Sequence, residues 1–546
     1  MDRKEFIKIS TLSGALVGGG LLSGCKTNDE DRTSTTINSG GDVGDFVLRE
    51  QTVADLRLAM EKGQLRSKDI TQLYLKRIEQ IDKNGPVLNA ILELNPDALS
   101  IAERLDQERE QGNVRGPLHG IPVVLKDNIE TSDKMKTTTG ALALAENNPA
   151  TDSWLAQKLR ENGAVILAKA NLSEWANFRS TRSSSGWSTL GGQTRNPYVL
   201  DRSPCGSSAG SGVAVSANLC ALAIGTETNG SVVCPSSANG VVGIKPTLGL
   251  WSRSGIIPLA HSQDTAGPMA RTVTDAAILL GALTGVDEKD PITGQSNGHS
   301  YTNYTQFLDK DGLQGQRIGV ARNYFGFHKE TDEVMNQAIE TMEKAGAVII
   351  DPISLEPDEP WGQAGFDVLL YEFKNDLNAY LETVSPEVEV ETLEDIIAFN
   401  KDHAEETMPY FGQEILEMAQ EKGSLSEPEY QEALTKIRRL SREKGIDNVM
   451  KEHQLDAIVA PTGGPAWPID LVNGDHFGGG SSSMAARAGY PNITVPAGYI
   501  HHLPVSISIF GTAWSEPELL RIAYSFEQYS KVRKPPSFKP NIGLPG

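Results

Sequence analysis

Two short segments rich in serine and glycine carry hydroxyl groups that could act as nucleophiles. They span residues 203–212 and 225–231. The chain between them reads as a helix and then a short strand, so both segments are predicted to be loops flanking one helix–strand unit. A serine attacks only when a base accepts its proton and N–H donors hold the developing oxyanion. Residues 228–231, Thr-Asn-Gly-Ser, offer consecutive N–H groups beside the hydroxyl of Ser231, which is therefore a candidate nucleophile.

The base that such a serine needs is predicted to be a lysine. None of the nine histidines lies in a recognisable triad pattern. Lys126 ends the apolar run 120–125, so its amine would project from a desolvated strand end. Lowering a lysine pKa from about 10.4 to about 7–8 costs on the order of 4 kcal/mol, which burial can supply. Asp127 is expected to point away, because neighbours on a strand face opposite sides. A solvated strand-end lysine is the structural alternative.

Other interpretations of these loops have less support. A Gly/Ser loop before a helix can cradle phosphate, but no Gly-Lys-Ser/Thr follows and the spacing of a dinucleotide fingerprint is absent. The sequence has no HExxH motif, CxxC pair or Cys/His cluster, so a metal site is not expected. Tight turns without any chemistry remain the structural alternative for both loops.

The elements that must position these residues predict one large α/β domain. Although 546 residues exceed the usual size of a single core, no convincing linker interrupts the body. Apolar runs without alternation indicate strands covered on both faces, and hence a central mixed, largely parallel sheet with helices on both sides. The candidate strands are 121–125, 165–168, 222–225, 318–321, 348–350, 457–460, 493–495 and 505–510.

Local signals add detail to this prediction. Thr52, Ser67 and Ser515 are predicted to cap helices. The polar segment 473–483 is expected to be a surface loop, with a lid over a pocket as the alternative.

The net charge bears on possible partners, and the cysteine content bears on possible disulfides. The formal net charge is −21 and the isoelectric point is about 5.0, which argues against nucleic acid as a partner. The four cysteines are Cys25, Cys205, Cys220 and Cys234. If Cys25 is consumed by lipidation, three remain, and an odd number does not allow a complete disulfide framework.

Residues 1–25 are predicted to be a lipoprotein signal peptide. Arg3 and Lys4 precede an apolar run over 9–22 that is too short to span a bilayer, which requires about 20 apolar residues. The run ends in Leu-Ser-Gly before Cys25, which resembles the bacterial lipobox, in which that cysteine is acylated. Residues 26–48 are polar and are predicted to form a flexible tether. The expectation is export and a lipid anchor in the bacterial cell envelope, with a plain signal peptide as the alternative.

Several motifs together resemble the amidase signature family. The resemblance extends from about residue 50 to 535 and implies an amidase domain over 49–540, with its signature core at about 116–290. Two segments, 171–179 and 511–517, are more closely similar to the bacterial peptide amidases, which remove the C-terminal amide of peptides. The family motifs are Lys-Asp-Asn at 126–128, the serine loop at 206–211, the turn at 225–231, Gly-Ile-Lys-Pro-Thr at 243–247 and the segment 263–271.

The resemblance implies a Ser-Ser-Lys triad with Ser231 as nucleophile, Ser207 as bridging serine and Lys126 as general base. It also implies a cis peptide bond between Gly206 and Ser207, a supporting role for Ser208, and no metal or organic cofactor. The oxyanion donors would be the backbone N–H groups of Thr228, Asn229, Gly230 and Ser231.

The implied reaction converts a carboxamide to an acid and ammonia through an acyl-enzyme, with a peptide C-terminal amide as the expected substrate. Val232 and Val233 stand where many relatives carry an arginine, which favours a neutral amide. Asn229 replaces a common glycine, and asparagine tolerates a left-handed backbone. The alternatives are fatty or aryl amides, the amidotransferase component of the same fold, and a non-catalytic peptide-binding envelope lipoprotein.

Overall fold

The computed structural model describes residues 46–543. The predicted signal peptide at 1–25, with Cys25, and almost all of the predicted tether at 26–48 lie outside the described residues. At the end of that tether, Leu48 is already buried and the Phe46 ring lies 5.8 Å from that of Tyr74. The packed body therefore begins before residue 49.

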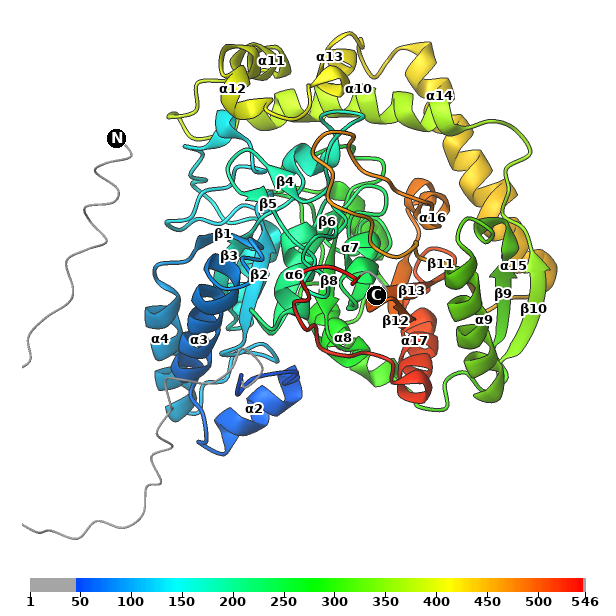
Figure 1. The fold of residues 1–546 in the computed structure, drawn as a ribbon, viewed down its shortest axis with the longest axis horizontal. Helices are drawn as coiled ribbons and strands as arrows, with labels where there is room; N and C mark the ends of the chain where they lie inside the picture. Colours follow the sequence, from blue (N-terminus) through cyan, green and yellow to red (C-terminus); the bar gives the residue numbers. More distant parts are fainter. Residues whose placement is uncertain (1–45, 544–546) are drawn as a thin grey trace, which may run out of the picture. The chain divides into compact units, whose positions relative to one another are not determined.

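A mixed sheet of eleven strands runs through the described chain in the order β1-β3-β2-β6-β8-β7-β12-β13-β11-β9-β10 (Figure 1). Parallel pairs form two blocks, β3-β2-β6 and β11-β9-β10, and antiparallel strands join these blocks. The strands are β1 (Ile91–Leu94), β2 (Pro122–Lys126), β3 (Val165–Ala170), β6 (Leu222–Glu227), β7 (Val242–Lys245), β8 (Thr265–Ala270), β9 (Arg317–Ala321), β10 (Val348–Ile353), β11 (Ala457–Pro461), β12 (Asn492–Ile500) and β13 (Leu503–Phe510). The predicted mixed α/β sheet is confirmed.

Burial explains why these strands could be found from sequence. All residues of β2, β3, β6 and β13 are buried, so helices cover both faces of the sheet there. Each of the eight predicted strands falls in this sheet. Strands β1, β7 and β8 were missed, and β8 contains Gly and Pro, which are depleted in strands. Separately, β4 (Trp187–Ser188) pairs with β5 (Gly192–Gln193) in a small hairpin.

Helices surround the sheet, and α10–α14 extend across one end of it (Figure 1). The α-helices are α2 (Val53–Glu61), α3 (Ser67–Arg77), α4 (Ala98–Glu110), α5 (Trp154–Glu161), α6 (Ala209–Ser216), α7 (Val233–Ala238), α8 (Val273–Ala282), α9 (Lys329–Lys344), α10 (Gly362–Leu381), α11 (Leu393–Asp402), α12 (Ala404–Thr407), α13 (Glu414–Gln420), α14 (Pro428–Ser441), α15 (Asp447–His453), α16 (Ser482–Ala488) and α17 (Glu516–Ser530). Among residues 46–543, none of the helices has the length and apolar character needed to cross a bilayer.

The helix caps agree only in part with the sequence prediction. Thr52 caps α2, because its hydroxyl accepts a bond from the Asp55 N–H at 3.1 Å. Ser67 is the first residue of α3 and not its cap, which is a correction. Its hydroxyl donates to the Gly120 carbonyl at 3.0 Å, a tertiary partner that local sequence does not reveal. Ser515 stands at the N-cap of α17, but its hydroxyl donates to the Thr512 carbonyl at 2.7 Å.

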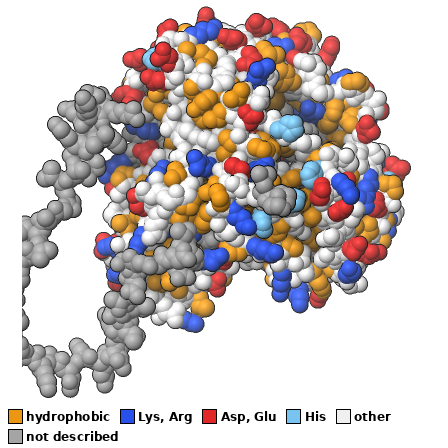
Figure 2. Space-filling model, viewed as in Figure 1, with side chains coloured by type: hydrophobic (Ala, Val, Ile, Leu, Met, Phe, Trp, Pro, Cys, Tyr) orange, Lys and Arg blue, Asp and Glu red, His pale blue; other side chains and the backbone are white. Residues whose placement is uncertain are grey.

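Two cysteines form a disulfide that the sequence did not predict. Cys205 and Cys234 are bridged, and their Cα atoms lie 6.1 Å apart. Cys220 is a free, buried thiol. On the molecular face seen in Figure 2, acidic and basic side chains are interspersed.

Candidate active site

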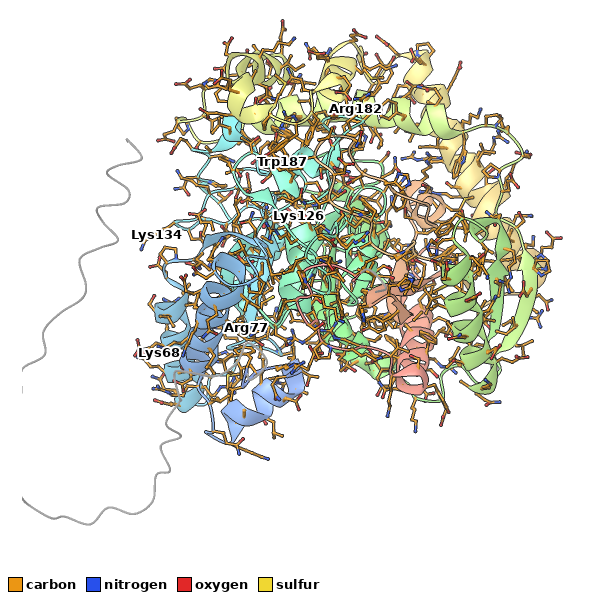
Figure 3. All side chains as sticks on the ribbon, in the orientation of Figure 1. Lys68, Arg77, Lys126, Lys134, Arg182 and Trp187 are labelled. Carbon is orange, nitrogen blue, oxygen red and sulfur yellow. A yellow bond between two sulfur atoms is a disulfide. The ribbon has the colours of Figure 1, made fainter. Side chains whose placement is uncertain are left out.

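Lys126 lies at the end of β2, in the interior of the molecule (Figure 3). Its side chain is fully buried. The amine Nζ contacts the Ser207 Oγ at 2.7 Å, the Thr226 Oγ1 at 2.8 Å and the Thr226 carbonyl oxygen at 3.2 Å. These three partners are neutral, so none of them holds the amine in its charged form.

Burial lowers the pKa of Lys126 to about 7, although the negative charges of Asp264 and Glu227 oppose this shift. The carboxylate of Asp127 points elsewhere, as predicted, and accepts a bond from the Thr138 N–H at 3.1 Å. Near neutral pH, the amine can therefore exist with a free lone pair and accept a proton.

Burial by itself does not single out this lysine. Lys169 and Lys245 are also fully buried, and burial lowers the pKa of both, to about 8 for Lys245. The Lys169 amine contacts the Ile129 carbonyl and the Thr137 hydroxyl, and the Lys245 amine contacts two backbone carbonyls. Among these three amines, only that of Lys126 contacts a serine hydroxyl.

Ser207 is buried in the loop before α6, and the Gly206–Ser207 peptide bond is cis, as the family resemblance implied. The Ser207 carbonyl accepts a bond from the Ser173 N–H at 3.0 Å. The next residue, Ser208, exchanges bonds with the backbone of Thr226: its hydroxyl donates to the carbonyl at 3.0 Å and accepts from the N–H at 3.1 Å. Ser208 therefore ties this loop to the end of β6.

The turn carrying Ser231 follows β6 and leads into α7. The Ser231 carbonyl accepts a bond from the Ser208 N–H at 3.2 Å, which joins the two serine loops directly. Gly230 has a φ of +91°, the left-handed backbone that glycine adopts without strain. Asn229 does not adopt a positive φ, so its tolerance of that backbone is not used. Its side chain instead bonds Ser482, with 2.8 Å between the oxygens.

Two residues that contribute to this arrangement were missed in the sequence analysis. Thr226 supplies two of the three oxygens around the Lys126 amine. The Glu227 carboxylate accepts bonds from the N–H groups of Val232 at 2.8 Å and Val233 at 3.0 Å, directly after the nucleophile candidate. Polar residues closing a buried strand were the signal that could have identified both.

The predicted loop or lid at 473–483 lies beside this turn. Asp475 accepts a bond from the Ser185 N–H at 3.0 Å, and Ser482 and Ser483 contact the Asn229 side chain. Phe477 remains exposed to solvent. The segment therefore packs against the turn of Ser231 at its C-terminal end and against Ser185 at Asp475, and it exposes an aromatic ring between them.

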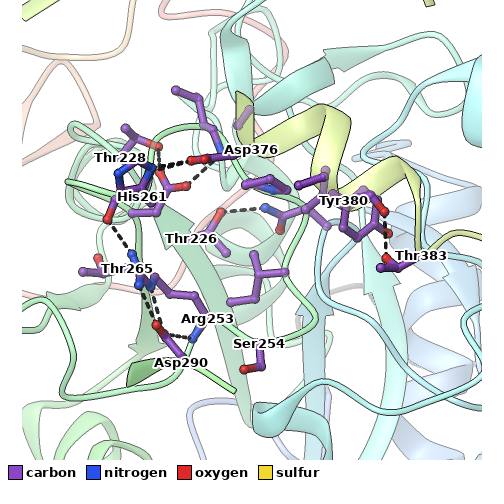
Figure 4. A pocket seen from close by; sticks show the side chains of 18 of the residues that line it. Thr226, Thr228, Arg253, Ser254, His261, Thr265, Asp290, Asp376, Tyr380 and Thr383 are labelled. Carbon is purple, nitrogen blue, oxygen red and sulfur yellow. Dashed lines mark hydrogen bonds and ion pairs between the residues drawn. The ribbon is translucent and has the colours of Figure 1, made fainter. Parts of the chain in front are cut away.

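A pocket of about 360 Å³ adjoins the site (Figure 4). Thr226 and Thr228 line it from β6 and the following turn, and Asp376 and Tyr380 line it from α10. Lys126, Ser207 and Ser231 are not among its lining residues. An apolar wall is formed by Ile256, Ile257, Pro258 and Leu259.

Two pairs of oppositely charged groups lie at this pocket. The Arg253 guanidinium lies 2.6 Å from the Asp290 carboxylate, and His261 Nδ1 lies 2.8 Å from the Asp376 carboxylate (Figure 4). Burial opposes protonation of the His261 ring, but the bond with Asp376 and the charge of Glu372 raise its pKa. The pocket therefore combines these two internal pairs with an apolar wall, and Lys289 adds a positive charge to its lining.

The chain is similar in sequence and in structure to known amidases. The family model described as Amidase matches residues 69–520. The native peptide amidase from Stenotrophomonas maltophilia is a similar solved structure, with 50% identity, a TM-score of 0.86 and coverage of 90% of this chain and 99% of that chain. A probable amidase of Arabidopsis thaliana is 43% identical over 90% of this chain and 92% of its own length. A glutamyl-tRNA(Gln) amidotransferase component from Thermoanaerobacter pseudethanolicus is 32% identical over 90% of this chain and 98% of its own length.

Burial of the Lys126 amine predicts that the free energy of unfolding depends on pH. Between pH 7 and pH 10 the unfolded chain binds a proton at Lys126 that the native protein lacks. The contribution of this residue to the free energy of unfolding therefore increases as the pH rises. We expect Lys126→Met to lose this dependence. From pH 6 to pH 9, the free energy of unfolding of the wild type should rise by about 3 kcal/mol relative to the variant. Urea denaturation of both proteins at these pH values measures the difference.

The control for this measurement is Lys329→Met, because that side chain is exposed on α9. Its denaturation curves should keep the pH dependence of the wild type. Parallel pH dependence of the Lys126→Met variant and the wild type would mean that the amine is charged in the native protein.

Proposed function

The chain belongs to the amidase signature family and is an amide hydrolase, and from this premise we propose that Ser231, Ser207 and Lys126 are its catalytic triad. The observation that carries this proposal is the 2.7 Å contact between the Lys126 amine and the Ser207 hydroxyl. A neutral amine at that distance can accept the hydroxyl proton. A protein that only binds peptides has no need for a desolvated lysine in contact with a serine.

The proposed cycle uses the two serines and the lysine as a proton relay. The Lys126 Nζ takes the proton of the Ser207 Oγ while that oxygen takes the proton of the Ser231 Oγ, which attacks the amide carbon. The relay then returns a proton to the substrate nitrogen, the C–N bond breaks and ammonia leaves. A water molecule attacks the acyl-enzyme, is deprotonated through the same relay, and releases the acid and Ser231.

The oxyanion that forms in both steps requires preorganised donors. We assign this role to the backbone N–H groups of Thr228, Asn229, Gly230 and Ser231. The bonds between Glu227 and the N–H groups of Val232 and Val233 support this assignment, because they fix the turn on its C-terminal side. Ser208 supports it from the other loop.

The proposed substrate is the C-terminal carboxamide of a peptide. This rests on the 50% identity with a protein described as a peptide amidase. The apolar wall of the pocket also supports this proposal, because it can pack against the uncharged part of a peptide amide. Fatty and aryl amides are the alternative substrates of the same mechanism.

Lipid anchoring at Cys25 and a place in the cell envelope are also part of the proposal. The lipobox-like sequence before Cys25 supports it. The Cys205–Cys234 disulfide supports export independently, because such bonds persist in oxidising compartments and are rare in the cytosol. Export would separate this chain from the cytoplasmic tRNA that is the substrate of an amidotransferase.

A panel of primary amides tests the reaction and the substrate class together. We expect ammonia and the free acid to form from amidated peptides faster than from fatty or aryl amides, as measured by mass spectrometry. Ser231→Ala should lower kcat by at least about 10³-fold. Ser426→Ala, at an exposed position far along the chain, should retain the wild-type rate. An active Ser231→Ala enzyme would remove Ser231 from the role of nucleophile.

The pH dependence of the rate tests Lys126 as the base. Only the neutral amine accepts a proton, so kcat/KM should rise with pH and level off above the Lys126 pKa of about 7. Lys126→Ala should lose most activity and the rising limb. A variant that keeps the wild-type pH profile, recorded between about pH 5.5 and 9, would assign that limb to another group.

Fractionation tests the proposed anchor. In a bacterial host, we expect the wild type in the membrane fraction and labelled by radioactive palmitate. Cys25→Ser should abolish both signals, because the acylated sulfur is gone. Cys220→Ala, which replaces the buried free thiol, should leave both unchanged. Membrane association that survives in Cys25→Ser would contradict acylation at this residue.

A further inference from the structure

The disulfide lies between the two serine loops. Cys205 precedes Ser207 by two residues, and Cys234 follows Ser231 by three. One half of the bridge therefore belongs to the loop of the proposed relay serine. The other half lies in the first turn of α7, where the Cys234 N–H donates to the Gly230 carbonyl at 2.8 Å.

Hydrogen bonds also join these segments. The Ser208 N–H bonds the Ser231 carbonyl at 3.2 Å, the Ser208 hydroxyl exchanges two bonds with the Thr226 backbone, and the Asn239 side chain bonds the Pro204 carbonyl at 2.9 Å. The segments come from different elements, since one leads into α6 and the other follows β6. Their relative position therefore depends on these hydrogen bonds and on the bridge, which is the covalent contact.

The bridge lies outside the main core. Cys205 packs in a small cluster with Tyr198, Trp467 and Leu503, and Cys234 contacts the same cluster. The main core contains most of the buried strand residues together with the free thiol of Cys220. The bridge therefore acts most directly on the two serine loops that it joins.

The two ends of the bridge differ in exposure. Cys234 is only partly buried, whereas Cys205 is 5% exposed. A dithiol can attack the Cys234 sulfur and break the S–S bond. The cysteines then become two thiols, and the dithiol becomes a disulfide.

We infer that the Cys205–Cys234 bridge is a positioning element that holds the loop of Ser207 in register with the turn of Ser231, so that full amidase activity requires the oxidised bridge. The inference rests on the proposed triad. A proton relay between hydroxyl groups requires hydrogen-bond distance, and a displacement of about 1 Å can cost on the order of 100-fold in rate. Opening the bridge lowers kcat and the reactivity of Ser231 and leaves substrate affinity largely unchanged.

The test compares the oxidised wild type, the wild type reduced with dithiothreitol, and the double variant Cys205→Ser/Cys234→Ser. kcat, KM and the rate of Ser231 labelling by a fluorophosphonate are measured well below the unfolding temperature. We expect reduction to lower kcat and the labelling rate by about 10–100-fold, with KM changed by less than about 3-fold. The double variant should start at the reduced rate and not respond to dithiothreitol. Reoxidation of the reduced wild type should restore its original kcat and labelling rate.

Cys220→Ala is the matched control, since it keeps the bridge and should respond to reductant like the wild type. Thiol titration confirms that the bridge is open, and near-ultraviolet circular dichroism confirms that the protein stays folded. A reduced, folded wild type with unchanged kcat overturns the inference. A loss of activity that tracks loss of the folded signal also overturns it, because the bridge would then only stabilise the fold. Failure of the triad proposal appears separately, as activity of oxidised Ser231→Ala.

Discussion

Removal of water from the Lys126 amine is the constraint on which the rest of the site depends. A buried lysine binds a proton again if a carboxylate approaches it, and three carboxylates lie in this region. Each of them is engaged elsewhere: Asp127 with Thr138, Glu227 with the N-terminus of α7, and Asp264 with the N–H groups of Leu259 and Ala260. The amine is left with neutral oxygen partners. Burial therefore outweighs the opposing charges of Asp264 and Glu227 and lowers the pKa of the amine.

The topology of the sheet explains why these groups meet. Strands β2 and β6 are parallel neighbours, with Leu125 opposite Ile224. Their carboxyl ends therefore lie at the same edge of the sheet, where polar side chains of open α/β folds commonly gather. Lys126 ends one strand and Thr226 and Glu227 end the other. The serine loops on either side of α6 and β6 complete the arrangement.

The proposed role of the bridge in catalysis and the proposed export of the chain agree with each other. Disulfides such as the one that joins the serine loops persist in oxidising compartments, and the proposed leader would direct the chain to one. The third cysteine of the described body, Cys220, is buried in the main core, where it is shielded from exchange with the bridge. The described body therefore holds three cysteines, of which two form one specific bridge.

Local sequence was enough to predict the mixed α/β architecture, the eight apolar strands, the cap at Thr52 and the serine and lysine motifs, because periodicity and local hydrogen bonding are encoded in neighbouring residues. It was not enough to select which of three buried lysines contacts a serine, since that depends on strand order in the folded chain. The contacts of Lys126 join it to residues 81 and 100 positions away. The Cys205–Cys234 pairing and the tertiary partner of Ser67 arise in the same way. Their cause is the meeting of distant segments in space, which a local pattern does not record.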